Sequence, residues 1–315
     1  MQFFEKTNIN FIGLRKFFFI FAILFIVVGL GLVGVLGIDF GIDFTGGSEI
    51  AVKFENTIKT DDFRNAILKG GVNADEIKSY GAQNQFLIRT KETGKIGDKI
   101  KGIIQTNIPN NNFEILKTDS IGPKVGAELA YQAIIAVVLA FIGMLIYIAF
   151  RFKFEYGLGA VVALIHDVIT AFIIIVLVQK TGIFALEINQ GIVAAMLTVV
   201  GYSVNDKVVI FDRIRENTEK SKGIDFHKIV NVSINETLSR TIITGISVMG
   251  VLLLMLFTAG PVLQGFVFTM LLGTIIGTYS SIYIASSFVI WFLEKRHKIS
   301  KDIIKSDSKK TVATA

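Results

Sequence analysis

The residues with the clearest capacity for chemistry lie inside apolar runs. Asn205 and Asp206 continue the apolar segment 192–200, which is hydrophobic enough for a lipid bilayer. An ionised Asp at a bilayer centre costs about 2.5–3.5 kcal/mol on insertion scales, so it usually has a partner for its charge. Arg240 opens the apolar run 241–257 and is the candidate. The pattern predicts that Asp206 and Arg240 form a titratable ion pair, and that protons crossing the membrane move the protein.

His166 and Asp167 form a second polar pair inside an apolar run. They lie about ten residues from its N-terminal end, hence roughly 15 Å deep if the run is helical. Two interpretations remain open: the pair is part of a proton path, or it is a locked polar contact between helices. Asn205, beside Asp206, is open to the same two interpretations.

The residue types argue against several other kinds of chemistry. Cysteine is absent, so disulfides, thiol chemistry and cysteine-ligated metals are excluded. The three histidines are scattered, without H-x-x-H or H-E-x-x-H spacing, so no structural metal site is expected. Asp39 and Asp43 are weak evidence for a cation site, because two carboxylates alone supply too few oxygen ligands.

The composition is that of a membrane protein. Hydrophobic residues make up 52% of the 315 residues, and the mean hydropathy is +0.60. Both values are too high for an ordinary soluble domain. Six apolar stretches are long enough to cross a bilayer, and they are expected at residues 17–37, 123–150, 158–178, 188–211, 240–258 and 265–293. The sequence therefore predicts a polytopic α-helical membrane protein with six transmembrane helices.

Lys and Arg residues are distributed unevenly between the two sides of the expected bilayer. The segments 1–16, 151–153, 207–240 and 295–310 hold nineteen of them, whereas the two short loops on the other side hold only Lys180. This positive-inside asymmetry predicts cytoplasmic N- and C-termini. The net charge of +6 is therefore a topology signal and does not indicate nucleic-acid binding.

Three segments are assigned to the cytoplasm on this basis: the N-terminus 1–16, the loop 212–239 and the tail 294–315. The loop carries apolar residues at helical spacing, which predicts a helix lying on the membrane surface. The first apolar run is not expected to be a cleaved signal peptide, because it is too long and no A-x-A-like site follows it.

Residues 38–122 separate the first two apolar runs and form a polar outer segment. Within it, alternating and helical patterns follow one another in the order strand, helix, strand, strand, helix, strand. This order is typical of a ferredoxin-like α+β domain. The sequence therefore predicts a ferredoxin-like periplasmic domain between the first and second transmembrane helices.

Glycines mark the connection into this outer domain. The stretch 37–47 reads GIDFGIDFTGG, and it lacks the G-x-x-x-x-G-K-[ST] order of a phosphate loop. Glycine permits tight backbone turns, so the stretch is interpreted as a hinge between the first helix and the outer domain. The residues assigned to this hinge are Gly41, Asp43, Gly46 and Gly47.

Small residues recur every four positions in the last apolar run. Gly273, Gly277 and Ser281 belong to this stripe and include a Gly-x-x-x-Gly. Small side chains allow helix backbones to approach closely within a membrane. The stripe is therefore predicted to pack against another helix, and the expected neighbour is a partner subunit.

Three stretches carry a resemblance to a known family. GIDFGIDFTGG at 37–47, VGYSVNDKVVIFDRIREN at 200–217 and SRTIIT at 239–244 closely resemble the SecF family, the smaller membrane subunits of the bacterial SecDF complex. The resemblance covers nearly the whole chain. It implies one half of an RND-type permease plan, a place in the bacterial inner membrane and assistance to preprotein export driven by the proton motive force.

The resemblance also implies partners and site residues. Its members act with SecD, the SecYEG channel and YajC, on an unfolded preprotein at the periplasmic domain, and the proton is the coupling ion in place of a cofactor. The proton-transport residues of the family fall on Asp206 and Arg240. No enzymatic activity is implied.

Other functions remain as alternatives. A self-contained RND-type small-molecule exporter would need a larger binding cleft than an outer domain of this size offers. A non-conducting structural subunit would use Asp206 and Arg240 only to hold helices together. An intramembrane aspartyl protease would need Asp167 and Asp206 to share a proton at about 3 Å, and the sequence shows no Gly-x-Gly-Asp.

Overall fold

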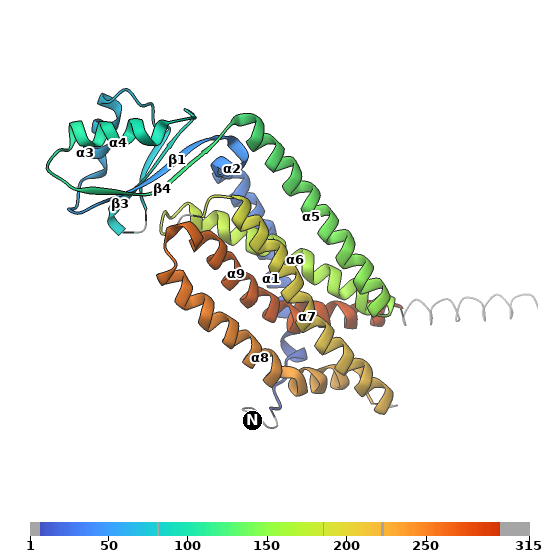
Figure 1. Ribbon diagram of the computed structural model, residues 1–315. Coiled ribbons are helices and arrows are strands. Elements are labelled where there is room, and N and C mark those ends of the chain that lie inside the picture. Colours follow the sequence, from blue (N-terminus) through green and yellow to red (C-terminus); the bar gives the residue numbers. More distant parts are fainter. Residues whose placement is uncertain (1–6, 81, 185, 222–223, 297–315) are drawn as a thin grey trace, which may run out of the picture.

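The computed structural model describes residues 7–80, 82–184, 186–221 and 224–296. The chain forms a long helical bundle with a small α+β domain at one end (Figure 1). Both parts follow from the hydropathy of the sequence, because the apolar runs form the bundle and the polar outer segment forms the small domain.

Among the described residues, six helices are long and apolar enough to cross a membrane, as predicted. They are α1 (Arg15–Leu36), α5 (Pro123–Arg151), α6 (Phe154–Gln179), α7 (Gln190–Lys220), α8 (Phe226–Thr258) and α9 (Pro261–Ser280). A short 3-10 turn, η1 (Ile12–Leu14), precedes α1, and a π-helical turn, η2 (Ser281–Ala285), continues α9 toward Arg296.

The segment 212–239 differs from the expected loop with a separate surface helix. Helix α7 continues to Lys220, and α8 already begins at Phe226. Asp225 caps α8 by accepting a hydrogen bond from the backbone N–H of His227. Arg213 and Asn217 of α7 bond to Glu236 and Ser233 of α8. The two helices therefore continue as a hairpin beyond their apolar parts. The expected surface helix is the first part of α8, which is bent against the rest (Figure 1).

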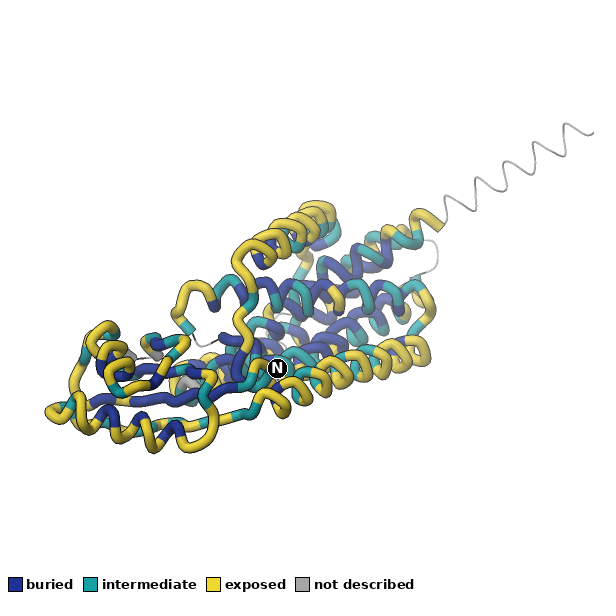
Figure 2. Tube along the Cα trace, turned by 90° about the horizontal axis from the view of Figure 1, so that it is seen from above, coloured by how far each residue is buried: buried dark blue, intermediate teal, exposed yellow. Residues whose placement is uncertain are grey.

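Helices α6, α7 and α9 lie at the centre of the bundle. Their buried residues are concentrated in the middle of the lengthwise view, and exposed residues run along both sides (Figure 2). Helix α5 stands apart, with Gly126 and Ile148 as its buried residues. An apolar surface this large on one helix faces lipid or a further protein in a membrane.

The outer domain has the ferredoxin-like order that the sequence predicted. Its elements are β1 (Gly47–Phe54), α3 (Thr60–Lys69), β2 (Glu76–Tyr80), β3 (Ala82–Thr90), α4 (Ile96–Asn107) and β4 (Phe113–Ile121). The antiparallel sheet has the strand order β2-β3-β1-β4. Phe54, Phe63 and Phe86 contribute to the core between the sheet and the helices α3 and α4. The other face of the sheet carries charged residues.

Candidate functional site

Close packing between α7 and α9 sets the geometry of the bundle centre. A Cβ atom at Gly273 would lie 2.3 Å from a methyl group of Val199, and one at Gly277 would lie 2.8 Å from Ser203 Oγ. The stripe of small residues, in which Ser281 is also buried, therefore faces α7 of the same chain. The expectation that it packs against a partner subunit is wrong, because α7 occupies that surface.

Asp206 lies buried at this contact, 4% exposed, on the side of α7 that faces α9. Its Oδ2 accepts a long hydrogen bond of 3.4 Å from the hydroxyl of Thr278. Among the residues that the structure describes, no cation lies within 4.0 Å of the Asp206 carboxylate. The carboxyl therefore sits among apolar helices without a direct counter-ion.

The predicted ion pair between Asp206 and Arg240 is not formed in this structure. Helices α7 and α8 run antiparallel, with Arg213 bonded to Glu236 at 2.7 Å. Arg240 lies four residues beyond Glu236, whereas Asp206 lies seven residues before Arg213, so the two residues lie within about one helical turn of each other along the bundle. Its side chain is exposed, however, and within the described part of the chain it pairs with no carboxylate inside 4.0 Å. Sequence spacing sets the depth of a residue along its helix, but not which neighbouring helix its side chain faces.

A buried ion pair is instead formed in the bundle by Lys207 and Asp167. Lys207 Nζ lies 2.8 Å from Asp167 Oδ2, and the two side chains are 0% and 1% exposed. Ser203 donates its hydroxyl to the same Asp167 oxygen at 2.6 Å. Sequence reasoning missed Lys207 although it interrupts the same apolar run as Asp206. Consecutive residues of a helix point about 100° apart, so Lys207 reaches Asp167 on α6 whereas its neighbour Asp206 contacts Thr278 on α9.

His166 and Asp167 are brought together as expected, with His166 Nδ1 3.1 Å from Asp167 Oδ1. Through Asp167 the pair forms a polar contact between α6 and α7. Asn205 lies elsewhere, exposed on α7, where it lines a groove with Gly143 and Met144 of α5. It is not part of either buried polar group.

The protease-like dyad of Asp167 and Asp206 does not fit this geometry. Asp167 is bound to Lys207 and Ser203, whereas Asp206 is bound to Thr278. Two carboxyls that share a proton must lie in direct contact. Neither aspartate is placed for that chemistry.

The glycine motif 37–47 is tied to the loop that leads into α7. Gly41 N–H donates to the carbonyl of Ile188 at 2.9 Å, and Ile188 N–H donates to the carbonyl of Asp39 at 3.0 Å. The Asp43 carboxylate accepts a hydrogen bond from Gln190 N–H at 2.9 Å, at the first residue of α7. The motif therefore does more than turn the chain, because it also holds the N-terminus of α7.

Gly46 and Gly47 form the entry into the outer domain. Both have positive φ values, 72° and 119°. A Cβ atom at Gly46 would lie 2.8 Å from Pro123 Cα, and one at Gly47 would lie 2.7 Å from the carbonyl oxygen of Thr90. Since Pro123 begins α5, the entry and the exit of the domain lie side by side, and glycine is required at both positions.

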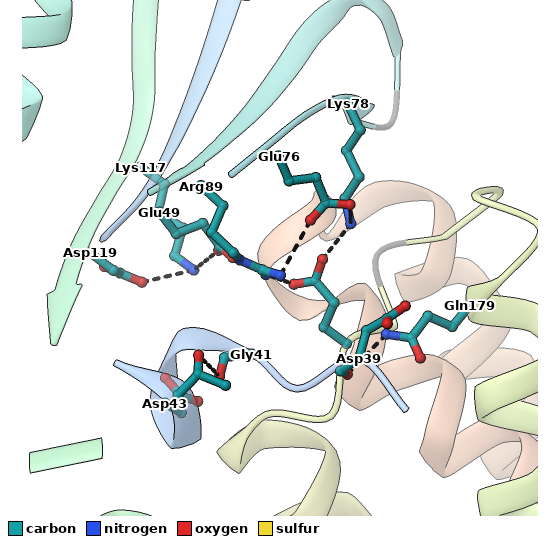
Figure 3. Close-up of polar contacts among 12 residues, drawn as sticks. Asp39, Gly41, Asp43, Glu49, Glu76, Lys78, Arg89, Lys117, Asp119 and Gln179 are labelled. Carbon is teal, nitrogen blue, oxygen red and sulfur yellow. Dashed lines mark hydrogen bonds and ion pairs between the residues drawn. The ribbon is translucent and has the colours of Figure 1, made fainter. Parts of the chain in front are cut away.

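Charged side chains on the sheet also reach the loop before α7. Glu187 forms ion pairs with Arg89 of β3 and Lys78 of β2. Arg89 further binds Glu49 at 2.9 Å and Glu76 at 3.3 Å (Figure 3). Sequence reasoning did not identify Glu187 or Arg89. Alternating polar residues on the strands indicate an exposed face and carry no signal for a partner far away in the chain.

Burial and neighbouring charges act in opposite directions within this network. Burial alone would raise the pKa of Glu49, but the ammonium of Lys117 and the guanidinium of Arg89 lower it below its ordinary value. Burial alone would lower the pKa of Lys117, but Asp119 and Glu49 raise it above its ordinary value. In each case the ion pairs outweigh the loss of solvation.

Asp39 and Asp43 are engaged by the protein itself. Asp39 Oδ2 pairs with Lys180 at 2.7 Å, and Asp43 caps α7. Over the described ranges, no three His, Asp or Glu side chains are grouped closely enough to hold a metal ion.

The fold defines a class of membrane protein. Within the described residues, six helices able to cross a membrane and a ferredoxin-like domain inserted after the first define a polytopic helical membrane protein with a small sheet domain. Two family models match the chain: "Protein export membrane protein SecD/SecF, C-terminal" over residues 101–295, and the "SecD/SecF GG Motif" over residues 31–58.

Relatives over nearly the whole length identify the particular family. The protein translocase subunit SecF of Endomicrobium trichonymphae is 39% identical over 98% of each chain. SecF of Calditerrivibrio nitroreducens is 40% identical, covering 90% of this chain and 94% of that protein, and SecF of Escherichia coli O157:H7 is 37% identical over 90% and 87%. The chain belongs to the SecF family.

Solved structures agree with this assignment. SecDF from Thermus thermophilus, a translocon-associated membrane protein, superposes with a TM-score of 0.82 at 30% identity over 92% of this chain. A structure of SecDF in a super-membrane-facing form superposes with a TM-score of 0.71 at 28% identity over 96% of this chain. This chain spans only 39% and 41% of those SecDF chains.

Proposed function

We propose that this chain is a membrane subunit of the Sec protein-export machinery, and that it uses the proton motive force to assist late translocation of preproteins. Membership of the SecF family and the translocase names of its relatives support the export role. In this role the chain has no catalytic reaction of its own and requires no cofactor. The proton is the coupling ion.

The proposed complex contains SecD as the second half of the permease. The likeness to SecDF supports this partner, since the chain matches about two fifths of a longer protein. The exposed apolar surface of α5 supplies area for such contact. SecYEG, YajC and an unfolded preprotein at the outer domain complete the proposed assembly. We place it in the bacterial inner membrane with both termini in the cytoplasm, on the positive-inside distribution of Lys and Arg.

The observation that carries the proton-driven mechanism is that one helix joins the buried acid to the outer domain. Helix α7 contains Asp206, and its first residue, Gln190, is held by the glycine motif through Asp43. Sixteen residues separate Gln190 from Asp206, which corresponds to about 24 Å of helix. The loop directly before α7 also holds the sheet through Glu187 and Arg89. A movement of α7 therefore acts on the domain at two points.

A change in the protonation state of Asp206 would drive that movement. The carboxyl lies on α7, within about one helical turn of Arg240 on α8 along the bundle, but the two do not touch in this conformation. We assign this arrangement to the protonated acid. Loss of the proton leaves a buried charge that must acquire a partner, because an isolated charge in a bilayer is costly. Pairing with Arg240 would then shift α7 against α8. A proton crossing a potential of 100 mV supplies about 2.3 kcal/mol for this step.

The test is proton-dependent export by the assembled complex. We expect Asp206→Asn to reduce gradient-dependent export of a preprotein in inverted membrane vesicles at least tenfold, and to abolish proton conduction by the reconstituted complex. Asp212→Asn is the matched control, since Asp212 lies on the same helix but pairs with Arg151 at the surface and is about one third exposed. Unchanged export by an assembled Asp206→Asn complex would refute the motor function and leave a structural subunit.

A further inference from the structure

The ammonium of Lys207 sits inside a cage of oxygen atoms at the bundle centre. Besides Asp167 Oδ2 at 2.8 Å, it donates to Ser280 Oγ of α9 at 3.0 Å and to the hydroxyl of Ser203, and it lies 3.4 Å from the carbonyl oxygen of Ser203. Asp167, Ser203, Ser280 and Lys207 are all buried, with exposures of 0% or 1%. One carboxylate, two hydroxyls and one carbonyl therefore surround a single positive charge.

Oxygen ligands of this kind are those that proteins use for hard metal cations. The cage combines one negative charge with neutral oxygens, so its charge matches a monovalent ion. Its oxygens come from three helices: α6, α7 and α9. On α9 the ligand Ser280 directly precedes the π-helical turn η2, a local change of helix geometry that is frequent at functional sites.

We propose that this cage is a monovalent-cation site whose occupant is the protein's own Lys207 ammonium. The tethered ammonium cannot dissociate, so it holds α6, α7 and α9 together in all ionic conditions and excludes free Na⁺ and K⁺ from the bundle centre. If the proposed function is correct, ion coupling is then confined to Asp206, on a different face of the same helix. The proposal itself rests on the geometry of the cage.

Removal of the ammonium should open the site to a free alkali cation. Lys207→Ala removes both the charge and the side chain and leaves space, whereas Lys207→Met removes the charge but still fills the space. The full chain would be purified with its SecD partner, and its melting temperature compared in NaCl, KCl and choline chloride at equal concentration. Choline is too large for a site vacated by one lysine side chain.

We expect about 0.3 M NaCl or KCl to raise the melting temperature of Lys207→Ala by about 5 °C relative to choline chloride, as ligand binding to the folded state does. The wild type and Lys207→Met should show no such difference. Lys220→Ala is a surface control on the same helix, with its ammonium bound to exposed Glu216, and should also show none. An equal salt response in all four proteins, or none in a folded Lys207→Ala, would overturn the proposal.

A second variant covers the case in which Lys207→Ala does not assemble in choline chloride. The double variant Lys207→Ala/Asp167→Asn lacks the uncompensated negative charge. It should therefore assemble in choline chloride, and its melting temperature should not respond to Na⁺ or K⁺. If the double variant assembles but Lys207→Ala cannot be recovered in NaCl, KCl or choline chloride, no free cation replaces the ammonium and the proposal fails. If Lys207→Ala is recovered only with Na⁺ or K⁺, the proposal is supported.

These outcomes are independent of the export assay. The melting temperatures report on occupation of the cage, whereas Asp206→Asn reports on the motor function. Refutation of the cation-site proposal therefore leaves the proposed motor function untouched, and the reverse also holds.

Discussion

Glu187 binds Arg89 across the boundary between the helical bundle and the outer domain. The acceptor lies in the loop before α7 and the donor on β3, and their side chains are 8% and 15% exposed. Separated by 98 residues in the chain, they connect the helix that carries Asp206 to the sheet. The pair therefore holds the domain in its present orientation.

Glu187→Gln should loosen this junction. The substitution removes the carboxylate that Arg89 and Lys78 share, but Arg89 keeps Glu49 and Glu76 as partners. We therefore expect a cost of about 2 kcal/mol, less than that of leaving a buried charge without any partner. Hydrogen exchange of the amides of Gly41, Ile188 and Gln190, which all bond across the junction, should accelerate roughly thirtyfold. Glu92→Gln removes an exposed pair with Lys99 and should leave these amides unchanged. Equal protection in Glu187→Gln would show that the backbone contacts suffice.

Alanine at Gly46 should be much more harmful than alanine at other glycines. Its φ of 72° disfavours any side chain, and Pro123 leaves no room for a Cβ atom. We expect a loss of about 3 kcal/mol in the free energy of unfolding. Gly71 has a similar φ but open space around it, so Gly71→Ala should cost about 1 kcal/mol. Gly102, in helix α4 with open space, should tolerate alanine without loss.

Chemical unfolding of the three variants measures their free energies of unfolding. The loss at Gly71 reports the strain of the positive φ alone, and the additional loss at Gly46 reports the collision with Pro123 of α5. Equal losses at Gly46 and Gly71 would show that the entry and the exit of the domain are not packed together as described.

Gly273→Ala should push α9 away from α7. The new methyl group would collide with Val199, and overpacking of this kind costs about 1–3 kcal/mol. Thermal unfolding in detergent should show a lower melting temperature, and the double variant Gly273→Ala/Val199→Ala should recover most of the loss. Gly250→Ala in α8, where the added methyl group meets open space, is the control. If Val199→Ala does not restore the melting temperature, the lost stability does not come from a collision between residue 273 and Val199.

Acidification should weaken the charged network on the sheet. The pKa of Glu49 is lower in the folded chain than its ordinary value, because Lys117 and Arg89 outweigh the effect of burial. Such a group contributes stability above its unfolded pKa of about 4.3, and the contribution is lost as the pH falls through the folded pKa. The melting temperature of the wild type should therefore fall from about pH 5 downward.

Glu49→Gln removes the titrating group, so its melting temperature should depend less on pH in the same range. Glu114→Gln, at an exposed position on β4, should retain the full acid dependence of the wild type. Parallel pH profiles for the wild type and Glu49→Gln would show that other carboxyls dominate the acid sensitivity.

Local patterns in the sequence were sufficient for the architecture. Runs of apolar residues identified six membrane helices, and alternating strands with two amphipathic helices identified the ferredoxin-like domain, because hydropathy and periodicity act over a few turns. The same patterns predicted a loop with a surface helix at residues 212–239, whereas α7 and α8 extend over most of this segment. Polar residues there continue both helices by bonding between them, as Arg213 and Glu236 do, and such pairing has no hydropathy signal.

The sequence by itself determined which unusual groups the membrane part must accommodate: Asp206, Arg240 and the pair His166–Asp167, all costly to place in lipid. Only the tertiary structure decided how their charges are balanced. In the structure, Asp167 forms an ion pair with Lys207, Asp206 accepts a hydrogen bond from Thr278, and the side chain of Arg240 is exposed. The physical reason is that the depth of a residue follows from its position along a helix, whereas its partners depend on how each helix is rotated against neighbours that are distant in the chain.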